Sequence, residues 1–345
     1  MEETRIAVVG AGLIGLRHME ALGQARGARL AAVIDPAPAA KDRAQSLGLP
    51  WFASVADMPP DTVDGVILAT PNQIHVEGGL ACVAQGLPVL VEKPFATSVE
   101  EAMVLLQAAE AAGVPLLTGH HRRYNPLIAA AKSLVTEGRI GRPVSVNGMF
   151  WLAKPDDYFD VAWRRQPGAG PVLVNLIHDI DLMRHLVGEV AAVQAVESRA
   201  VRGNAVEDAC VIILEFENGA LGTMNVADCI PAPWSWELTS GENPAYPQTD
   251  QACYVIGGTE GALELPRVRL WRHEGKRSWW EPLSATTAPR PSGDPLVLQA
   301  EHFARVIQAQ EPPLVSGREG TRTLQVIEAV KASARDRQRI TIETL

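Results

Sequence analysis

The segment "RIAVVGAGLIG" (residues 5–15) determines the fold of the first part of the chain. Its β-branched apolar run is typical of a strand that is buried on both faces of a parallel sheet. Three glycines follow in the spacing GxGxxG, where the strand passes into a helical pattern. Gly10 permits a tight turn, Gly12 lets the backbone approach a pyrophosphate, and Gly15 allows close packing between helix and sheet.

A carboxylate completes this pattern. Asp35 ends the next apolar run and lies 20 residues after the last of the three glycines. A carboxylate there accepts hydrogen bonds from both ribose hydroxyls of a dinucleotide and repels a 2′-phosphate. Pro36 follows it and Arg43 is the nearest arginine after it, so NAD is favoured over NADP. We assign Leu13 and Ile14, within the glycine-rich turn, to the cofactor as well.

The first 120 residues repeat the alternation of strand and helix. Strands are expected at 5–10, 30–35, 64–70, 87–94 and 114–119. Helices are expected near 13–25, 37–47, 73–86 and 98–112. Ser98 and Glu101 form a capping-box pattern at the start of the last of these helices. Repeated βα units with right-handed crossovers predict an α/β Rossmann domain, a doubly wound parallel sheet.

A different pattern begins after residue 120. Helices are expected near 125–137, 171–187, 296–310 and 318–337. Strands are expected at 190–202, 209–217, 220–230, 234–240, 252–257 and 262–272, whereas 284–295 is typical of a loop. These runs predict an α+β domain, an open and mostly antiparallel sheet with helices on one face. With 345 residues, the chain is expected to form a domain at 1–120 and a second at 121–345.

Composition limits the function classes. The net charge of −9 argues against a nucleic-acid binder, and no apolar run approaches the ~18 residues of a membrane span. The first residues, "MEETRIAVVGAG", lack the basic-then-apolar pattern of a signal peptide. The four cysteines are scattered without a CxxC motif, and nothing suggests a metal site. We therefore expect a cytoplasmic protein with reduced thiols.

Polar residues follow two of the predicted strands. In "ILATPNQIH" (67–75), Thr70 and Asn72 lie where open α/β sheets bind their ligands, and His75 starts the next helix. His75 serves either the cofactor or helix capping and packing. In "VEKPFATS" (91–98), Glu92 and Lys93 end another strand, where an ammonium group can stabilise alkoxide character as hydride leaves a substrate.

The stretch "VLVNLIHDID" (172–181) places ionisable side chains among apolar neighbours, where burial is costly unless they are paired or used. The motifs GxGxxG with Asp35, "ATPNQIH" (69–75), "EKP" (92–94), "GHHRRYNP" (119–126) and "HDID" (178–181) occur in this order. Together they resemble the glucose–fructose oxidoreductase, inositol dehydrogenase and MocA family.

The resemblance implies a function and a site. Lys93 and His178 would flank the substrate carbon that faces the nicotinamide, with a cis peptide bond before Pro94. His178 would accept a proton when an alcohol is oxidised and donate one in reduction. Asp181 is expected to be structural, and Asp179 either faces solvent or belongs to the site. The second domain would hold the substrate and build homodimers or homotetramers through its sheet.

The chain also departs from that family. Inositol-dehydrogenase-like members carry an aspartate four residues before the histidine, but here the position is Val174, followed by Asn175. The missing carboxylate–histidine pair argues against an inositol or plain aldose substrate. A sugar, cyclitol or sugar acid remains expected, oxidised at a secondary alcohol or hemiacetal carbon. Expected contacts to it are Tyr124, Trp163, Arg164, Asn175 and His178.

Other assignments stay open. Arginine pairs at 122–123 and 164–165 could bind a substrate carboxylate or face solvent or the cofactor. Trp234, Trp236 and Glu237 contact either a sugar or the core. Two alternative functions are a non-catalytic NAD-binding co-regulator and a redox-neutral, NAD-dependent glycosidase.

Overall fold

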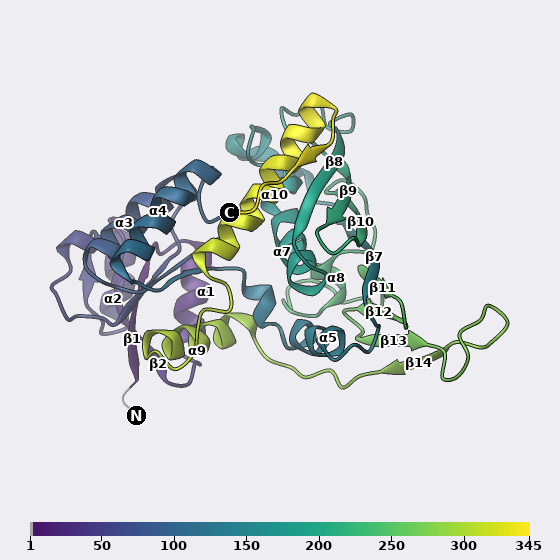
Figure 1. Cartoon of the computed structure of the whole chain (residues 1–345). Helices are drawn as coiled ribbons and strands as arrows, with labels where there is room; N and C mark the ends of the chain where they lie inside the picture. Colours follow the sequence, from purple (N-terminus) through teal and green to yellow (C-terminus); the bar gives the residue numbers. More distant parts are fainter. Residues whose placement is uncertain (1–2) are drawn as a thin grey trace. The chain divides into compact units, whose positions relative to one another are not determined.

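The chain divides into two compact units in the computed structural model, which describes residues 3–345 (Figure 1). The first unit comprises Met1–Tyr124 and Gly293–Leu324, and the second comprises Asn125–Ser292 and Gln325–Leu345. The sequence predicted a first domain at 1–120 and a second at 121–345. The structure instead groups Gly293–Leu324 with the first unit.

The first unit contains a six-stranded sheet in the order β3-β2-β1-β4-β5-β6, in which neighbouring strands are parallel. The strands are β1 (Thr4–Val9), β2 (Ala28–Ile34), β3 (Trp51–Phe52), β4 (Gly65–Leu68), β5 (Val89–Val91) and β6 (Leu116–Thr118). The predicted doubly wound sheet is confirmed, and β3 is an additional short strand. The strand order reverses between β1 and β4, the place where such sheets bind dinucleotides.

Helices lie on both sides of this sheet (Figure 1). They are α1 (Leu13–Leu22), α2 (Pro38–Ser46), α3 (His75–Ala84), α4 (Val99–Ala112) and α9 (Pro295–Ile307). Short 3-10 helices are η1 (Val55–Asp57), η2 (Asn72–Ile74) and η3 (His121–Tyr124). At the start of α4 the Ser98 hydroxyl accepts a hydrogen bond from the Glu101 amide at 3.2 Å, so the predicted cap is present.

Helix α9 belongs to the first unit because its apolar face completes that unit's core. Ala300, Phe303, Ala304 and Val306 are buried together with apolar residues of α1, β1 and β2. The glycine at position 65 makes room for this helix, since a Cβ there would lie 2.5 Å from the Ile307 side chain.

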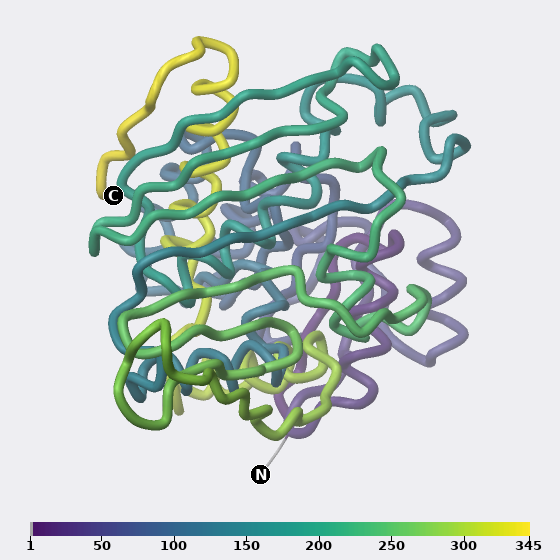
Figure 2. Tube along the Cα trace, turned by 90° about the vertical axis from the view of Figure 1, so that its right-hand side faces the viewer, coloured from purple at the N-terminus to yellow at the C-terminus, as the bar shows by residue number. Residues whose placement is uncertain are grey.

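The second unit contains a nine-stranded sheet in the order β14-β13-β12-β11-β7-β10-β9-β8-β15. The strands are β7 (Pro143–Trp151), β8 (Val190–Ser198), β9 (Ala209–Phe216), β10 (Leu221–Ala227), β11 (Tyr254–Gly258), β12 (Ala262–Leu265), β13 (Arg269–Arg272), β14 (Ser284–Thr287) and β15 (Ile340–Thr341). Neighbours are antiparallel except β7 and β10. The predicted open, mostly antiparallel sheet is confirmed, and Figure 2 looks onto it.

One face of this sheet packs against helices. They are α5 (Pro126–Thr136), α6 (Pro171–Val174), α7 (Leu176–Leu186), α8 (Trp236–Thr239) and the last part of α10 (Gly317–Asp336). The unit also contains the 3-10 helices η4 (Asp156–Asp160) and η5 (Ala162–Arg165). Ile212, Leu214 and Met224 of the sheet share a core with Ile177 and Ile180 of α7. None of the helices within residues 3–345 has both the length and the apolar character of a membrane span.

Four local predictions for the second unit differ from the structure. The predicted strand 234–240 contains α8, whose first turn is capped by the Ser235 hydroxyl accepting from the Leu238 amide at 3.3 Å. The predicted loop 284–295 begins with β14. The predicted helix 171–187 is two helices, because the chain is interrupted at Asn175 between α6 and α7. The run 262–272 is divided into β12 and β13, with a cis peptide bond before Pro266.

Candidate functional site

The glycine-rich turn after β1 is shaped by close contacts of its own backbone. Gly10 has a φ of +90°, and a Cβ there would lie 2.6 Å from the Ala69 carbonyl oxygen. A Cβ on Gly15 would lie 1.9 Å from the Gly10 carbonyl oxygen, so only glycine lets α1 start this close to the turn. A Cβ on Gly12 would meet no described atom within 4 Å, and Leu13 is 86% exposed. The open N-terminus of α1 therefore fits a pyrophosphate.

Asp35 connects this turn to the end of β2. One carboxylate oxygen accepts from the Ala11 amide at 2.7 Å, and the other accepts from the Ala37 amide at 2.8 Å. Two backbone donors thus fix the orientation of the carboxylate. A carboxylate has about four acceptor positions, so it can still accept from ribose hydroxyls. The geometry fits the role that the sequence predicted for Asp35.

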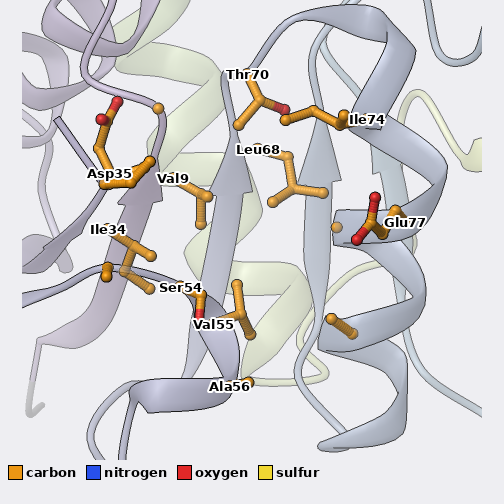
Figure 3. A pocket seen from close by; sticks show the side chains of 15 residues that line it. Val9, Ile34, Asp35, Ser54, Val55, Ala56, Leu68, Thr70, Ile74 and Glu77 are labelled. Atoms are coloured by element: carbon orange, nitrogen blue, oxygen red, sulfur yellow. The ribbon is translucent and has the colours of Figure 1, made fainter.

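A cavity of about 410 Å³ lies beside Asp35 at the carboxyl ends of β1, β2 and β4 (Figure 3). It is lined by Val9, Gly10, Ile34, Asp35, Pro36, Ala53, Ser54, Val55, Ala56, Leu68, Thr70, Ile74, Glu77, Gly78 and Ala81. The Thr70 hydroxyl is buried and makes no hydrogen bond to the described residues, so it is available to a ligand. Asn72 begins η2, directly after the Thr70–Pro71 segment. The adenosine part of a dinucleotide fits this mostly apolar cavity.

His75 is buried between two loops at this edge of the sheet. Its Nδ1 lies 2.9 Å from the Pro94 carbonyl oxygen, and its Nε2 lies 2.9 Å from the Thr70 carbonyl oxygen. Burial lowers the pKa of His75, although the two carbonyl contacts oppose this shift. The sequence left two roles open for His75, cofactor binding or capping and packing. These contacts correspond to packing between the two loops.

The EKP turn follows β5. The peptide bond between Lys93 and Pro94 is cis, as the resemblance implied. Glu92 is buried, and its carboxylate lies 2.7 Å from Nε2 of His18 and accepts from the Lys93 amide at 3.1 Å. Burial alone would raise the pKa of Glu92, but the hydrogen bond and charge of His18 lower it to about 2. A fixed negative charge therefore lies directly before Lys93.

The residues after β6 are mostly paired within the first unit. Arg122, Arg123 and Tyr124 of η3 are buried. Arg123 forms an ion pair with Glu319 at 2.9 Å, and the ring of Tyr124 lies 5.2 Å from that of His302. Arg123 is thus engaged by a carboxylate of this chain.

Helix α7 carries His178 in the second unit. His178 is 7% exposed, and Asp179 and Asp181 beside it are buried. Asp179 accepts a hydrogen bond from the Tyr254 hydroxyl, so it faces the core of this unit and not solvent. The Asn175 Oδ1 atom is buried and has no hydrogen-bond partner among residues 3–345. An acceptor oxygen is therefore available three residues before His178.

The interruption at Asn175 separates Val174 from His178. The sequence predicted one helix at 171–187, with Val174 and His178 one turn apart. In the structure Val174 ends α6, whereas His178 lies in the first turn of α7. A carboxylate at position 174 would therefore not have the regular spacing of side chains four residues apart on one helix.

The remaining candidates in the second unit divide into exposed and buried groups. Trp163 is 57% exposed. The Arg164 guanidinium lies 4.1 Å from the ring centroid of Tyr158 and donates to the Tyr158 carbonyl at 2.8 Å. Trp236 is a core residue, since it is buried and stacks on Tyr254 at 5.9 Å between ring centroids.

Sequence reasoning missed Lys154, at the end of β7. Its ammonium group is largely buried and lies 3.1 Å from the carboxylate of Asp228, which also pairs with Arg202 at 2.5 Å. Burial lowers the pKa of Lys154, and Asp228 opposes this shift. The available signal was a Lys-Pro pair after a strand, the same signal that selected Lys93.

These features define a class of protein. A Rossmann sheet with an open glycine-rich turn, an oriented ribose-binding carboxylate and an adjoining cavity is an NAD-binding domain, and here an open antiparallel sheet follows it. Residues 4–120 match the model described as "Oxidoreductase family, NAD-binding Rossmann fold", and residues 128–264 match the "GFO/IDH/MocA C-terminal domain". The chain belongs to the GFO/IDH/MocA family of oxidoreductases and is an NAD-dependent enzyme.

Three similar proteins illustrate the relationship. The rhizopine catabolism protein MocA of Rhizobium meliloti is 30% identical over 239 residues, 67% of this chain and 73% of that protein. The D-apiose dehydrogenase of Paraburkholderia graminis is 28% identical over 361 residues, 98% of this chain and 90% of that protein. The crystal structure of the WlbA dehydrogenase from Bordetella pertussis, in complex with NADH and UDP-GlcNAcA, is 27% identical with a TM-score of 0.79 and covers 99% of each chain.

Proposed function

We propose that this enzyme transfers hydride between NAD and a secondary alcohol or hemiacetal carbon of a sugar, cyclitol or sugar acid. The observation that carries the proposal is the position of Lys93. It follows β5, at the same edge of the sheet as the glycine-rich turn and Asp35. Strand β5 lies beyond the switch point between β1 and β4, in the half of the sheet that receives the second nucleotide of a dinucleotide.

The residues have separate roles in this proposal. Lys93 donates a hydrogen bond to the substrate oxygen and stabilises its alkoxide character, while His178 accepts the hydroxyl proton. Their joint action is what the resemblance of the EKP (92–94) and HDID (178–181) motifs to the family implies. Asn175 accepts from a second substrate hydroxyl through Oδ1. NAD, when bound, supplies the hydride acceptor.

The remaining assignments follow the same proposal. Tyr124, Trp163 and Arg164 contact the substrate. The cofactor is bound by Gly10, Gly12, Leu13, Ile14, Gly15, Asp35, Thr70, Asn72, Glu92 and Lys93, and His75 packs between the two loops beside it. The names of the relatives support the substrate class, since one is a D-apiose dehydrogenase and the WlbA dehydrogenase was crystallised with UDP-GlcNAcA.

The test is a screen of sugars, cyclitols and sugar acids for growth of the reduced-nicotinamide absorbance. With the best substrate, His178→Ala should lose turnover, whereas His185→Ala on the same helix should retain it. If NADH binds but no member of the panel reacts, the dehydrogenase is rejected in favour of the co-regulator. Release of a sugar from a glycoside without net NADH formation would indicate the redox-neutral glycosidase.

We also propose that the enzyme is a homodimer or homotetramer that assembles through the exposed face of the nine-stranded sheet. Strand register places Val196, Val211, Ile213, Leu221 and Val255 on one face, where each is at least 45% exposed. Exposed apolar side chains gathered on one face of a sheet favour a protein interface.

The segment between β13 and β14 supports the same assembly. Figure 1 shows it projecting beyond these strands, toward the side that faces the viewer in Figure 2. Trp279 and Trp280 in this segment are 88% and 84% exposed. Docking of this segment on a second copy would remove two large apolar side chains from water.

Light scattering on a size-exclusion column tests the assembly. The double variant Val211→Lys, Ile213→Lys should run as a monomer, because ammonium groups cannot be buried unpaired in an interface. Val104→Lys is the matched control, since Val104 is 53% exposed on α4. An unchanged mass for the double variant would reject the sheet face as the interface.

The compartment is a further proposal. Cys82, Cys210 and Cys229 are free thiols. Burial raises the pKa of Cys82 and of Cys210 to about 12, which keeps them protonated and unreactive. Reduced thiols support a cytoplasmic location, which fractionation of the native host would test.

A further inference from the structure

The EKP turn is contacted by buried histidines from two different helices of the first unit. His18 lies in α1, the helix that opens at the glycine-rich turn. His75 is the first residue of α3, the helix that follows the Thr70–Pro71–Asn72 segment. Each is only 1% exposed.

The contact of His18 is to the residue before Lys93. Its Nε2 lies 2.7 Å from Oε1 of Glu92, and Oε2 of the same carboxylate accepts from the Lys93 amide. Because the Glu92 carboxylate is ionised, it can only accept, so the ring nitrogen of His18 donates. Glycine at position 119, directly after β6, makes room for this carboxylate, since a Cβ there would lie 2.7 Å from Oε1.

The contact of His75 is to the residue after Lys93. Its Nδ1 faces the Pro94 carbonyl oxygen and its Nε2 faces the Thr70 carbonyl oxygen, each at 2.9 Å. Carbonyl oxygens only accept, and a neutral imidazole has one N–H to donate. The ring therefore spans the EKP turn and the segment whose Thr70 lines the cofactor cavity.

We infer that His18 and His75 are positioning residues for Lys93, holding the EKP turn from its two ends through Glu92 and Pro94. A lysine side chain has four rotatable bonds, so the position of its amine depends on a fixed backbone at its base. Misplacement of a catalytic group by ~1 Å can cost on the order of a hundredfold in rate. This inference rests on the proposed role of Lys93, and in it His18 and His75 act through Lys93.

The first test compares substitutions that keep or remove one donor. Turnover is measured as NADH formation from the best substrate of the panel. We expect His18→Leu and His75→Leu to lower kcat by roughly 10- to 100-fold, with a change of less than about threefold in the Kd for NADH. His18→Gln keeps a donor near the position of Nε2, and His75→Asn keeps one near Nδ1, so both should restore most of the kcat. His75→Gln, which reaches toward Thr70 instead, should not.

A double-mutant cycle distinguishes positioning from general destabilisation. In the Lys93→Met background, His18→Leu and His75→Leu should cause no further loss of kcat, because they act through Lys93. Leu105→Ala, a buried core change on α4, should lower the melting temperature without lowering kcat at a temperature well below it. Additive losses in the cycle would overturn the inference.

A second measurement does not depend on the substrate. Reductive methylation with ¹³C-formaldehyde labels the lysines, and the Lys93 signal is the one absent from Lys93→Met. This signal should shift in His18→Leu and His75→Leu but not in Leu105→Ala, and an unchanged signal in both histidine variants overturns the inference. Normal turnover of Lys93→Met would reject the proposed catalytic role instead, and the labelling result would then decide the positioning alone.

Discussion

The glycine-rich turn allows folding and cofactor binding to be separated by two single-methyl substitutions. A Cβ on Gly15 would lie 1.9 Å from the Gly10 carbonyl oxygen, whereas ordinary contacts require more than about 3 Å. Gly15→Ala therefore forces α1 away from the turn by more than about 1 Å. Overpacking of this kind costs about 1–3 kcal/mol in the free energy of unfolding.

Gly12→Ala should instead weaken NADH binding without lowering the free energy of unfolding. Its φ of −72° and ψ of −170° suit alanine, and the new Cβ would meet no described atom within 4 Å. The free energy of unfolding should stay equal or rise by up to about 1 kcal/mol, because alanine reduces the entropy of the unfolded chain. The methyl group instead occupies space at the pyrophosphate. Loss of one hydrogen bond to a charged group, about 1.5–3 kcal/mol, weakens NADH binding roughly 10- to 100-fold.

Two assays measure these effects independently. Urea unfolding without cofactor gives the free energy of unfolding, and titration of NADH fluorescence gives the Kd. Equal destabilisation by the two substitutions would show that Gly12 is packed against the protein. Binding of NADH by Gly12→Ala with wild-type affinity would show that the pyrophosphate lies elsewhere.

Three further predictions concern the first unit. NADPH should bind at least about tenfold more weakly than NADH at equal ionic strength, and Asp35→Ser should narrow this ratio; tighter NADPH binding in the wild type contradicts the role of Asp35. Lys93→Met should lower turnover by roughly 10²–10³ with the NADH Kd nearly unchanged, and full activity would remove Lys93 from the mechanism. The pKa of Glu92 is lowered from 4.5 to about 2, so the ionised carboxylate stabilises the folded protein above pH 4.5. This contribution to the free energy of unfolding, on the order of 3 kcal/mol, is lost as pH falls from 4.5 toward 2. Denaturant unfolding between pH 5 and about pH 3 should therefore depend less on pH in Glu92→Gln than in the wild type; equal dependence would contradict the assignment.

The Rossmann part of the fold was predictable because its signals are local. The glycine spacing, the β-branched runs and Ser98 each act within a few residues, and each predicts an element that the structure contains. Strand β3 has only two residues, too few for a recognisable pattern. The membership of α9 was not predictable, because its partners in β1 and β2 lie more than 260 residues earlier in the chain.

In the candidate site too, local signals in the sequence were predictive, whereas contacts between distant residues were not. Asp35 was predicted from its distance along the chain, and the backbone donors around it fit that prediction. The break at Asn175 was missed because the apolar pattern continues across it. His18 was missed and the role of His75 stayed open, because the carboxylate or carbonyl that a buried histidine contacts is seen only in the structure.

Helix α9 belongs to the first unit but is synthesised after most of the second unit, and this affects how the first unit folds during synthesis. The chain passes between the two units three times, and the Rossmann sheet emerges from the ribosome long before Phe303. Until α9 is synthesised, the apolar surface around Gly65 that this helix covers stays exposed to water. The nascent NAD-binding unit therefore spends the synthesis of most of the second unit without part of its core, and a fragment cut at residue 120 would keep that exposed surface permanently.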